Sequence, residues 1–146
     1  MNLTSNPAFV AYAVSLIVLS LNLLVLWAYS GGVRGKTKTT PNKEDGGRGA
    51  AIVDADPPDV ARVLRAHKNA MANIVPFAIL GLIYVLSGGS ATVAMAVFGV
   101  FTFARIAHSF AYLGGRQPWR SVFFVVGLLS TVVLIGFIVR ALAVGA

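Results

Sequence analysis

Four long apolar stretches alternate with three polar connections along the chain. The apolar stretches cover about residues 7–29, 58–86, 92–113 and 120–142. Each is long enough to cross a bilayer as a helix, since a hydrocarbon core of ~30 Å takes about 20 helical residues. The pattern predicts an all-α integral membrane protein with a single domain, built as a bundle of four transmembrane helices.

The long connection over residues 30–57 is the polar exception in the chain. Its glycines and prolines argue against a continuous helix and predict a loop. The composition fits a solvated linker, and the length also fits a functional lid. Asp56 stands before two prolines, where it suits the cap of the following helix.

The composition agrees with a membrane protein and restricts its chemistry. Hydrophobic residues make up 57% of the chain and charged residues 12%, against roughly 25% in soluble domains. The first apolar stretch has no basic residue ahead of it and is longer than the apolar core of a signal peptide, so we expect a retained helix. The chain has no cysteine, so any thiol chemistry must use a sulfur brought by a ligand.

The net charge of +7 is distributed unevenly along the chain. Basic residues lie beside the apolar stretches, so membrane lipid headgroups or an anionic substrate are favoured as partners over nucleic acid. Eight of the twelve Lys and Arg residues lie in the first connection and the opening turns of the second stretch, and Arg116 and Arg120 lie at the third connection. The positive-inside rule then predicts that both connections are cytoplasmic and that both termini lie on the opposite side.

Polar residues within the apolar stretches occupy particular faces of the predicted helices. Asn22, in the first stretch, suits a hydrogen bond to a neighbouring helix, with a place facing a ligand cleft as the alternative. Gly127 and Gly136 are expected to allow close helix packing. The second stretch has a polar stripe with spacings of three, four and four, formed by Arg62, Arg65, Asn69 and Asn73.

The third and fourth stretches add polar groups at the same end of the bundle. Arg105, His108 and Tyr112 share one helix face, and Arg120 and Ser121 open the fourth stretch. An arginine within such a span requires an anion, a carbonyl group or water. The predicted topology brings these groups to one membrane face beside the second stretch. They form a constellation rich in guanidinium groups, which suit carboxylates.

A family resemblance extends from about residue 22 to residue 121. It is carried by the ordered motifs RAHxN, RxxHxxAY and PxRS, within the segments DPPDVARVLRAHKNAMANIVPF, ARIAHSFAYL and RQPWRS. The chain resembles the MAPEG family, the membrane-associated proteins in eicosanoid and glutathione metabolism. The similarity is to the branch of microsomal glutathione transferase and microsomal prostaglandin E synthase.

The resemblance implies a homotrimer of four-helix protomers, with glutathione bound between subunits near the cytoplasmic face. It implies that Arg120 and Ser121 are catalytic and activate the glutathione sulfur, since a nearby guanidinium favours the thiolate. Asp45 matches an acid of the first connection that can hold the catalytic arginine. The residues implied to line or support the glutathione pocket are Arg34, Arg65, Lys68, Asn69, Arg105, His108 and Tyr112.

The implied function is a glutathione-dependent enzyme that uses no metal. Its reaction is expected to be transfer to lipophilic electrophiles, peroxidase reduction of lipid peroxides, or isomerisation of an eicosanoid-like endoperoxide. The alternative is a non-catalytic lipid-binding or scaffold member with weak or lost glutathione binding, because Ala70 and Ala72 replace acids of the family and Phe124 replaces a tyrosine. A small transporter is disfavoured, because the first helix and the centres of the third and fourth lack an ionisable residue.

Overall fold

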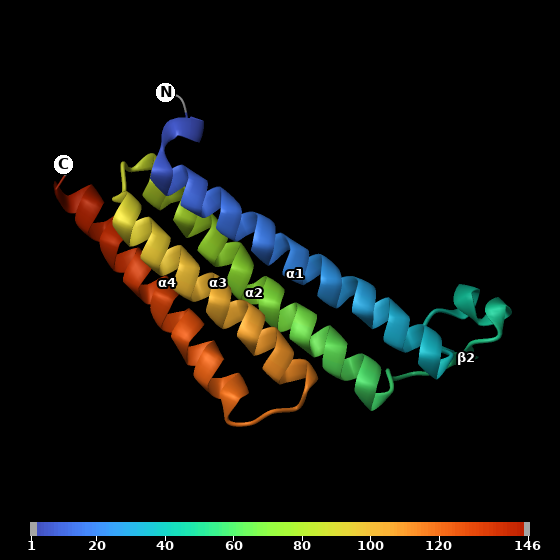
Figure 1. Ribbon diagram of the computed structural model, residues 1–146. Helices are drawn as coiled ribbons and strands as arrows, with labels where there is room; N and C mark the ends of the chain where they lie inside the picture. Colours follow the sequence, from blue (N-terminus) through green and yellow to red (C-terminus); the bar gives the residue numbers. More distant parts are fainter. Residues whose placement is uncertain (1–2, 145–146) are drawn as a thin grey trace.

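Four long helices lie side by side in the computed structural model (Figure 1). The structure describes residues 3–144 apart from the side chains of residues 47 and 48. The side chain of Arg48, in the basic first connection, therefore lies outside the described residues. All four helices are long and apolar enough to cross a membrane, which confirms the predicted multi-pass membrane architecture. The helices are α1 (Pro7–Thr37), α2 (Pro58–Leu86), α3 (Ala91–Leu113) and α4 (Trp119–Val144).

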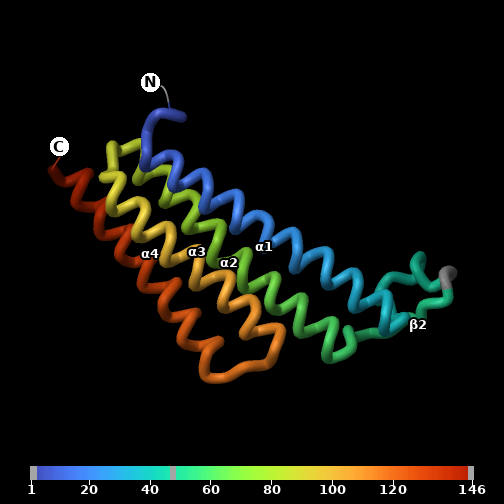
Figure 2. The backbone as a smooth tube through the Cα atoms, in the orientation of Figure 1, coloured from blue at the N-terminus to red at the C-terminus, as the bar shows by residue number. Residues whose placement is uncertain are grey.

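The helices are arranged so that α1 and α4 lie on opposite sides of the bundle. Helix α3 packs against both α1 and α4, and α2 contacts the other three helices, whereas α1 and α4 do not contact each other within the described residues. The start of α1 and the end of α4 lie at one end of the bundle. At the other end, the connection from α1 to α2 and the connection from α3 to α4 project from different sides (Figure 2).

Aromatic rings form much of the core between α1, α2 and α3. Phe77 stacks on Phe101 with ring centroids 3.5 Å apart, and Phe98 meets Phe77 edge to face at 5.7 Å. A polar link also joins two helices, since the Asn22 side-chain amide donates a hydrogen bond to the Ser109 hydroxyl at 3.2 Å. This bond confirms the helix–helix role predicted for Asn22.

Helix α1 continues to Thr37, so the predicted end at residue 29 is wrong. A glycine inside a helix costs only about 1 kcal/mol relative to alanine, so the glycines in this segment do not stop the helix. The helix ends where Lys38 adopts a left-handed conformation, with φ of 50°. Its last turns are joined to the segment before α2 by an ion pair between Arg34 and Asp56, with Nη2 and Oδ1 2.7 Å apart.

The connection between α1 and α2 has structure of its own. Strands β1 (Thr39–Thr40) and β2 (Ala51–Ile52) pair in parallel on either side of the short 3-10 helix η2 (Lys43–Arg48), while η1 (Leu3–Ser5) precedes α1. The predicted cap of α2 at Asp56 is wrong, because the capping position is Pro57 and makes no side-chain hydrogen bond there. Asp56 instead pairs with Arg34 and helps to hold the connection against α1.

Candidate functional site

A cavity of about 300 Å³ lies between α2, α3 and α4, near the end of the bundle that carries the α3–α4 connection. Three helices contribute its polar groups, as the predicted topology requires. Phe124 and Val125 provide apolar wall. Five of the predicted site residues line this cavity, namely Asn69, His108, Tyr112, Arg120 and Ser121.

The Arg120 guanidinium is fixed at the cavity by its neighbours. It lies over the Tyr112 ring, with 4.8 Å from Cζ to the ring centroid. Gln117 bridges Arg120 and Ser121 when its amide is oriented to satisfy all three residues. In that orientation the amide oxygen accepts from Arg120 Nε at 3.1 Å and Nη2 at 2.7 Å, and the amide nitrogen donates to the Ser121 hydroxyl at 3.2 Å.

Gln117 is a site residue that the sequence analysis missed. It stands in the α3–α4 connection, where a polar residue is expected to face solvent. Its spacings of three and four to Arg120 and Ser121 are those of neighbours on a helical surface, and this was the available signal. The arrangement couples the two predicted catalytic residues through one neutral side chain.

Two further polar groups in the cavity lack protein partners. The side-chain oxygen of Asn69 is buried and accepts no hydrogen bond from the described residues. His108 is buried against the rings of Tyr112 and Phe124, with centroids 5.6 and 6.2 Å away, and its ring makes no hydrogen bond within the described chain. A buried acceptor without a partner is costly, so a polar ligand that donates to Asn69 would be stabilised here.

Arg105 lies behind the cavity wall rather than in its lining. Only 1% of the residue is exposed, and its Nη2 donates to the carbonyl oxygen of Phe124 at 2.9 Å. The guanidinium lies 5.5 Å from the ring centroids of both Phe101 and Phe124. This carbonyl group is one of the three kinds of partner expected for an arginine within a span, the others being an anion and water. Arg105 therefore supports α4 at the cavity and adds positive charge behind it.

The other predicted site residues lie outside this cavity. Arg34 and Asp45 line a separate cavity of about 520 Å³ beside the end of α1. Asp45 accepts hydrogen bonds there from Thr40 Oγ1 at 3.3 Å and Asn42 Nδ2 at 3.1 Å, so in a single chain it contacts these residues and not Arg120. Arg65 and Lys68 are exposed on α2. Within a single chain, the predicted site residues therefore lie in separate parts of the bundle.

The cavity between α2, α3 and α4 is positively charged. None of the residues that line it is acidic, because all five Asp and Glu residues of the chain fall between positions 44 and 59. Arg120 faces the cavity and Arg105 stands behind it. A guanidinium and a hydroxyl side by side can stabilise an anion, and a guanidinium near a thiol favours the nucleophilic thiolate.

Comparisons with known proteins identify the family of this chain. It is 41% identical to human prostaglandin E synthase over 120 residues, which cover 81% of this chain and 79% of the human protein. It is 37% identical to prostaglandin E synthase of Equus caballus over 129 residues, covering 87% and 84% of the two chains. It is 49% identical to microsomal glutathione S-transferase 1 of Rattus norvegicus over 69 residues, covering 47% and 44%. Residues 10–140 match the family model, and the chain therefore belongs to the MAPEG family.

Proposed function

We propose that this protein is a membrane-bound, glutathione-dependent enzyme, a transferase or an isomerase that acts on lipophilic molecules. The observation that carries the proposal is the pairing of Arg120 and Ser121 through Gln117 in a cavity without acids, in a chain without a thiol of its own. The relatives support it, since one is named a glutathione S-transferase and others are named prostaglandin E synthase.

In the proposed reaction, glutathione supplies the sulfur and the protein stabilises the thiolate. The Arg120 guanidinium offsets the negative charge on sulfur, and the Ser121 hydroxyl donates a hydrogen bond to it. The cavity lining holds no carboxylate, and His108 is buried against two aromatic rings without a hydrogen-bond partner in the described chain, so solvent is the expected acceptor of the thiol proton. In transfer, the thiolate then forms a bond to an electrophilic carbon and expels the leaving group. Reduction of lipid peroxides is a further reaction open to the same thiolate.

The division of the site supports a homotrimer. Arg34 and Asp45 lie on the α1 side of the bundle and Arg120 on the α4 side, and α1 does not contact α4 within the described chain. If the α1 side of one copy meets the α4 side of the next, the interface joins unlike surfaces, and such an interface forms a ring when the rotation between copies closes. Arg34 and the exposed Arg65 and Lys68 would then hold the two carboxylates of glutathione across the interface. The number of copies, three, and the place of the site at the cytoplasmic face are what the family resemblance implies, and both are part of the proposal.

A non-catalytic scaffold is the second candidate, and the structure bears on the substitutions that suggest it. Ala70 is 2% exposed, packs in the core and does not line the cavity. Ala72 is exposed on α2, where the family has a glutamate that would receive the amino group of glutathione. Phe124 lines the cavity without a hydroxyl. The unpartnered oxygen of Asn69 provides another acceptor for that amino group, which favours retained binding.

The test is a comparison of Arg120→Ala with Arg140→Ala, a matched change on the same helix at the far end of α4. Detergent-purified proteins are assayed with glutathione and chlorodinitrobenzene, and separately with cumene hydroperoxide. Loss of a donor that stabilises a developing anion costs about 10²–10³ in rate, so we expect this decrease for Arg120→Ala and none for Arg140→Ala.

A binding measurement separates the enzyme from the scaffold. Saturable thermal stabilisation of the unmodified protein by millimolar glutathione is expected of the enzyme. If Arg120→Ala retains full activity, the assignment of Arg120 is wrong. If glutathione neither stabilises the protein nor supports turnover, the scaffold is the better description.

A further inference from the structure

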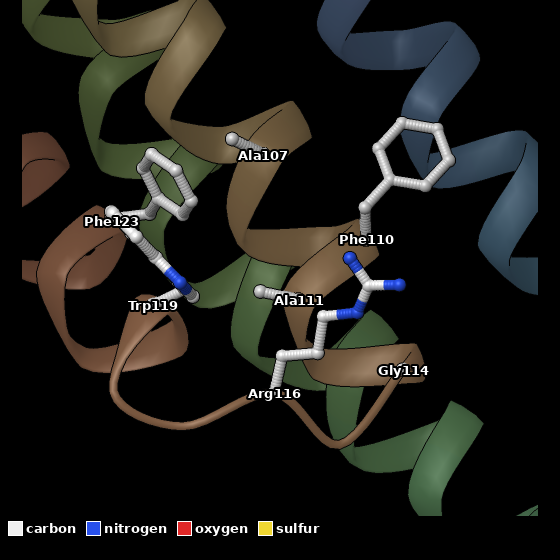
Figure 3. Close-up of a pocket in the computed structure, with 7 residues that line it drawn as sticks. All are labelled: Ala107, Phe110, Ala111, Gly114, Arg116, Trp119 and Phe123. Carbon is white, nitrogen blue, oxygen red and sulfur yellow. The ribbon is translucent and has the colours of Figure 1, made fainter.

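A second cavity of about 620 Å³ lies on another side of the α3–α4 pair (Figure 3). It shares no lining residue with the cavity that contains Arg120. Because an α-helix turns by about 100° per residue, Ala107 and Ala111 face a different direction from His108 and Tyr112. We call this cavity the outer groove. Its lining consists of Ala107, Phe110, Ala111, Gly114, Arg116, Trp119 and Phe123.

The walls of the outer groove are apolar and open to the surroundings of the bundle. Phe110 is 72% exposed on the α3 side, and Trp119 is 57% exposed at the first residue of α4. The Trp119 and Phe123 rings stack with centroids 6.0 Å apart, and Phe103 meets Phe123 edge to face at 6.1 Å. Phe103 is itself 65% exposed, so the aromatic wall extends from the helix ends toward the middle of the spans.

Arg116 stands at the mouth of the outer groove with its charge unpaired. Figure 3 shows its side chain extending from the connection along α3 toward Phe110, with Trp119 and Phe123 on the opposite wall. Its guanidinium makes no hydrogen bond or ion pair with any described residue. The acids of the chain all lie between positions 44 and 59, in the connection before α2 and in the first turn of α2, and none of them pairs with Arg116 in the described chain.

The apolar walls and the unpaired arginine suit one kind of ligand at the end of the membrane-spanning helices. A groove at this level that is apolar along its length, cationic at its mouth and bordered by a tryptophan has the polarity of a phospholipid at the membrane interface. We propose that the outer groove binds an anionic phospholipid, with an acyl chain along Phe110 and Phe123 and the headgroup phosphate on Arg116. In the orientation proposed above, the groove faces the cytoplasmic leaflet, where anionic lipids are found.

The inference does not depend on the proposed enzyme activity. The lipid site uses none of the residues assigned to glutathione, and it lies on another side of α3 and α4. A bound lipid would fill the space between the two helices next to the connection that carries Gln117. The site can therefore be tested by lipid binding alone.

Tryptophan fluorescence reports on the groove directly, because the chain has two tryptophans and Trp119 lines it. Trp27→Phe removes the other, which is 67% exposed on α1. The full-length variant is reconstituted in vesicles with brominated phosphatidylglycerol or brominated phosphatidylcholine, and quenching is measured against their mole fraction. A basic residue near an anionic surface contributes about a fivefold preference. We expect half-maximal quenching at a mole fraction of brominated phosphatidylglycerol about fivefold lower than that of brominated phosphatidylcholine.

Two further variants in the Trp27→Phe background decide the role of the cation. Arg116→Gln is expected to abolish the preference, whereas Arg140→Gln, at the other end of α4, is expected to keep it. Equal quenching by the two lipids in the parent, or a preference that survives Arg116→Gln, overturns the proposal. If a second copy of the chain covers the groove, neither lipid quenches Trp119 and the proposal also fails.

Discussion

Replacing Gly127 by alanine tests whether the buried arginine behind the cavity is held as tightly as its contacts indicate. A Cβ atom at position 127 would lie 2.2 Å from Nη2 of Arg105, 2.5 Å from Nε and 2.7 Å from Cζ. Ordinary contact begins at 3.4 Å, so the guanidinium would have to move by about 1 Å. Flexible side chains often make such a move without loss. Here the guanidinium is buried, bonded to the Phe124 carbonyl and flanked by two rings.

The expected magnitude follows from what this displacement breaks. A hydrogen bond from a charged group contributes about 1.5–3 kcal/mol, and overpacking a filled site costs typically 1–3 kcal/mol. Alanine in place of glycine raises the free energy of unfolding by up to about 1 kcal/mol, because its helix propensity is higher. We therefore expect Gly127→Ala to lower the free energy of unfolding by about 2 kcal/mol. The same change at Gly136, where a Cβ would meet nothing within 4 Å, is expected to be neutral or stabilising by up to about 1 kcal/mol.

The assay is thermal unfolding of both variants in one detergent, followed by intrinsic fluorescence. A difference of about 2–3 kcal/mol between them corresponds to roughly 4–12 °C in the unfolding midpoint for a chain of this size. Arg105→Met in the Gly127→Ala background removes the crowded guanidinium and is expected to recover part of the loss, so the two changes are non-additive. Equal midpoints for Gly127→Ala and Gly136→Ala would refute the reasoning.

Two other predictions concern polar contacts. Gln117→Ala frees the guanidinium of Arg120 from its bridge to Ser121, so kcat of the glutathione reaction is expected to fall about tenfold. Gln117→Glu restores the acceptor for Arg120 but adds a charge that offsets the guanidinium, so kcat is expected to recover only in part, whereas a purely structural role would give the same kcat for both variants. Asn22→Leu removes the hydrogen bond to Ser109 and is expected to lower stability by about 0.6 kcal/mol, the mean for such bonds between membrane helices. A shift in the unfolding midpoint checks it, and a midpoint at or above that of the parent would contradict it.

The four-helix membrane architecture and much of the cavity could be predicted from the sequence. Four apolar stretches of spanning length leave little freedom in the fold, because a helix in a bilayer must satisfy its backbone internally. The spacing of His108 and Tyr112 put both on one face of α3, and the topology then brought Arg120 and Ser121 to them. These positions depend on helix geometry and connectivity alone.

The features that the sequence did not reveal depend on tertiary contacts. Helix α1 extends to Thr37, and the Arg34–Asp56 pair joins its last turns to the segment before α2, whereas local composition indicated a loop. Arg105 shares a helix face with His108, but its long side chain reaches the Phe124 carbonyl on α4 instead of the cavity. Gly136 was expected to allow close packing and has an open environment within this chain. The sequence spacing determines on which helix face a Cα atom lies, whereas the residues packed around a long side chain determine where its end group lies.

The partner of Arg120 determines how much of its charge is available to a ligand. Within one chain that partner is the neutral amide of Gln117, which fixes the guanidinium without cancelling its charge. A carboxylate in the same place would satisfy the same donors and also offset much of the positive potential that favours a thiolate. If the ring proposed above forms and brings Asp45 of a neighbouring copy to Arg120, Gln117 and Asp45 compete for the same N–H groups. We expect the amide to favour the state in which the full charge of Arg120 faces the sulfur, and the α3–α4 connection would then set the reactivity of the site together with the helices.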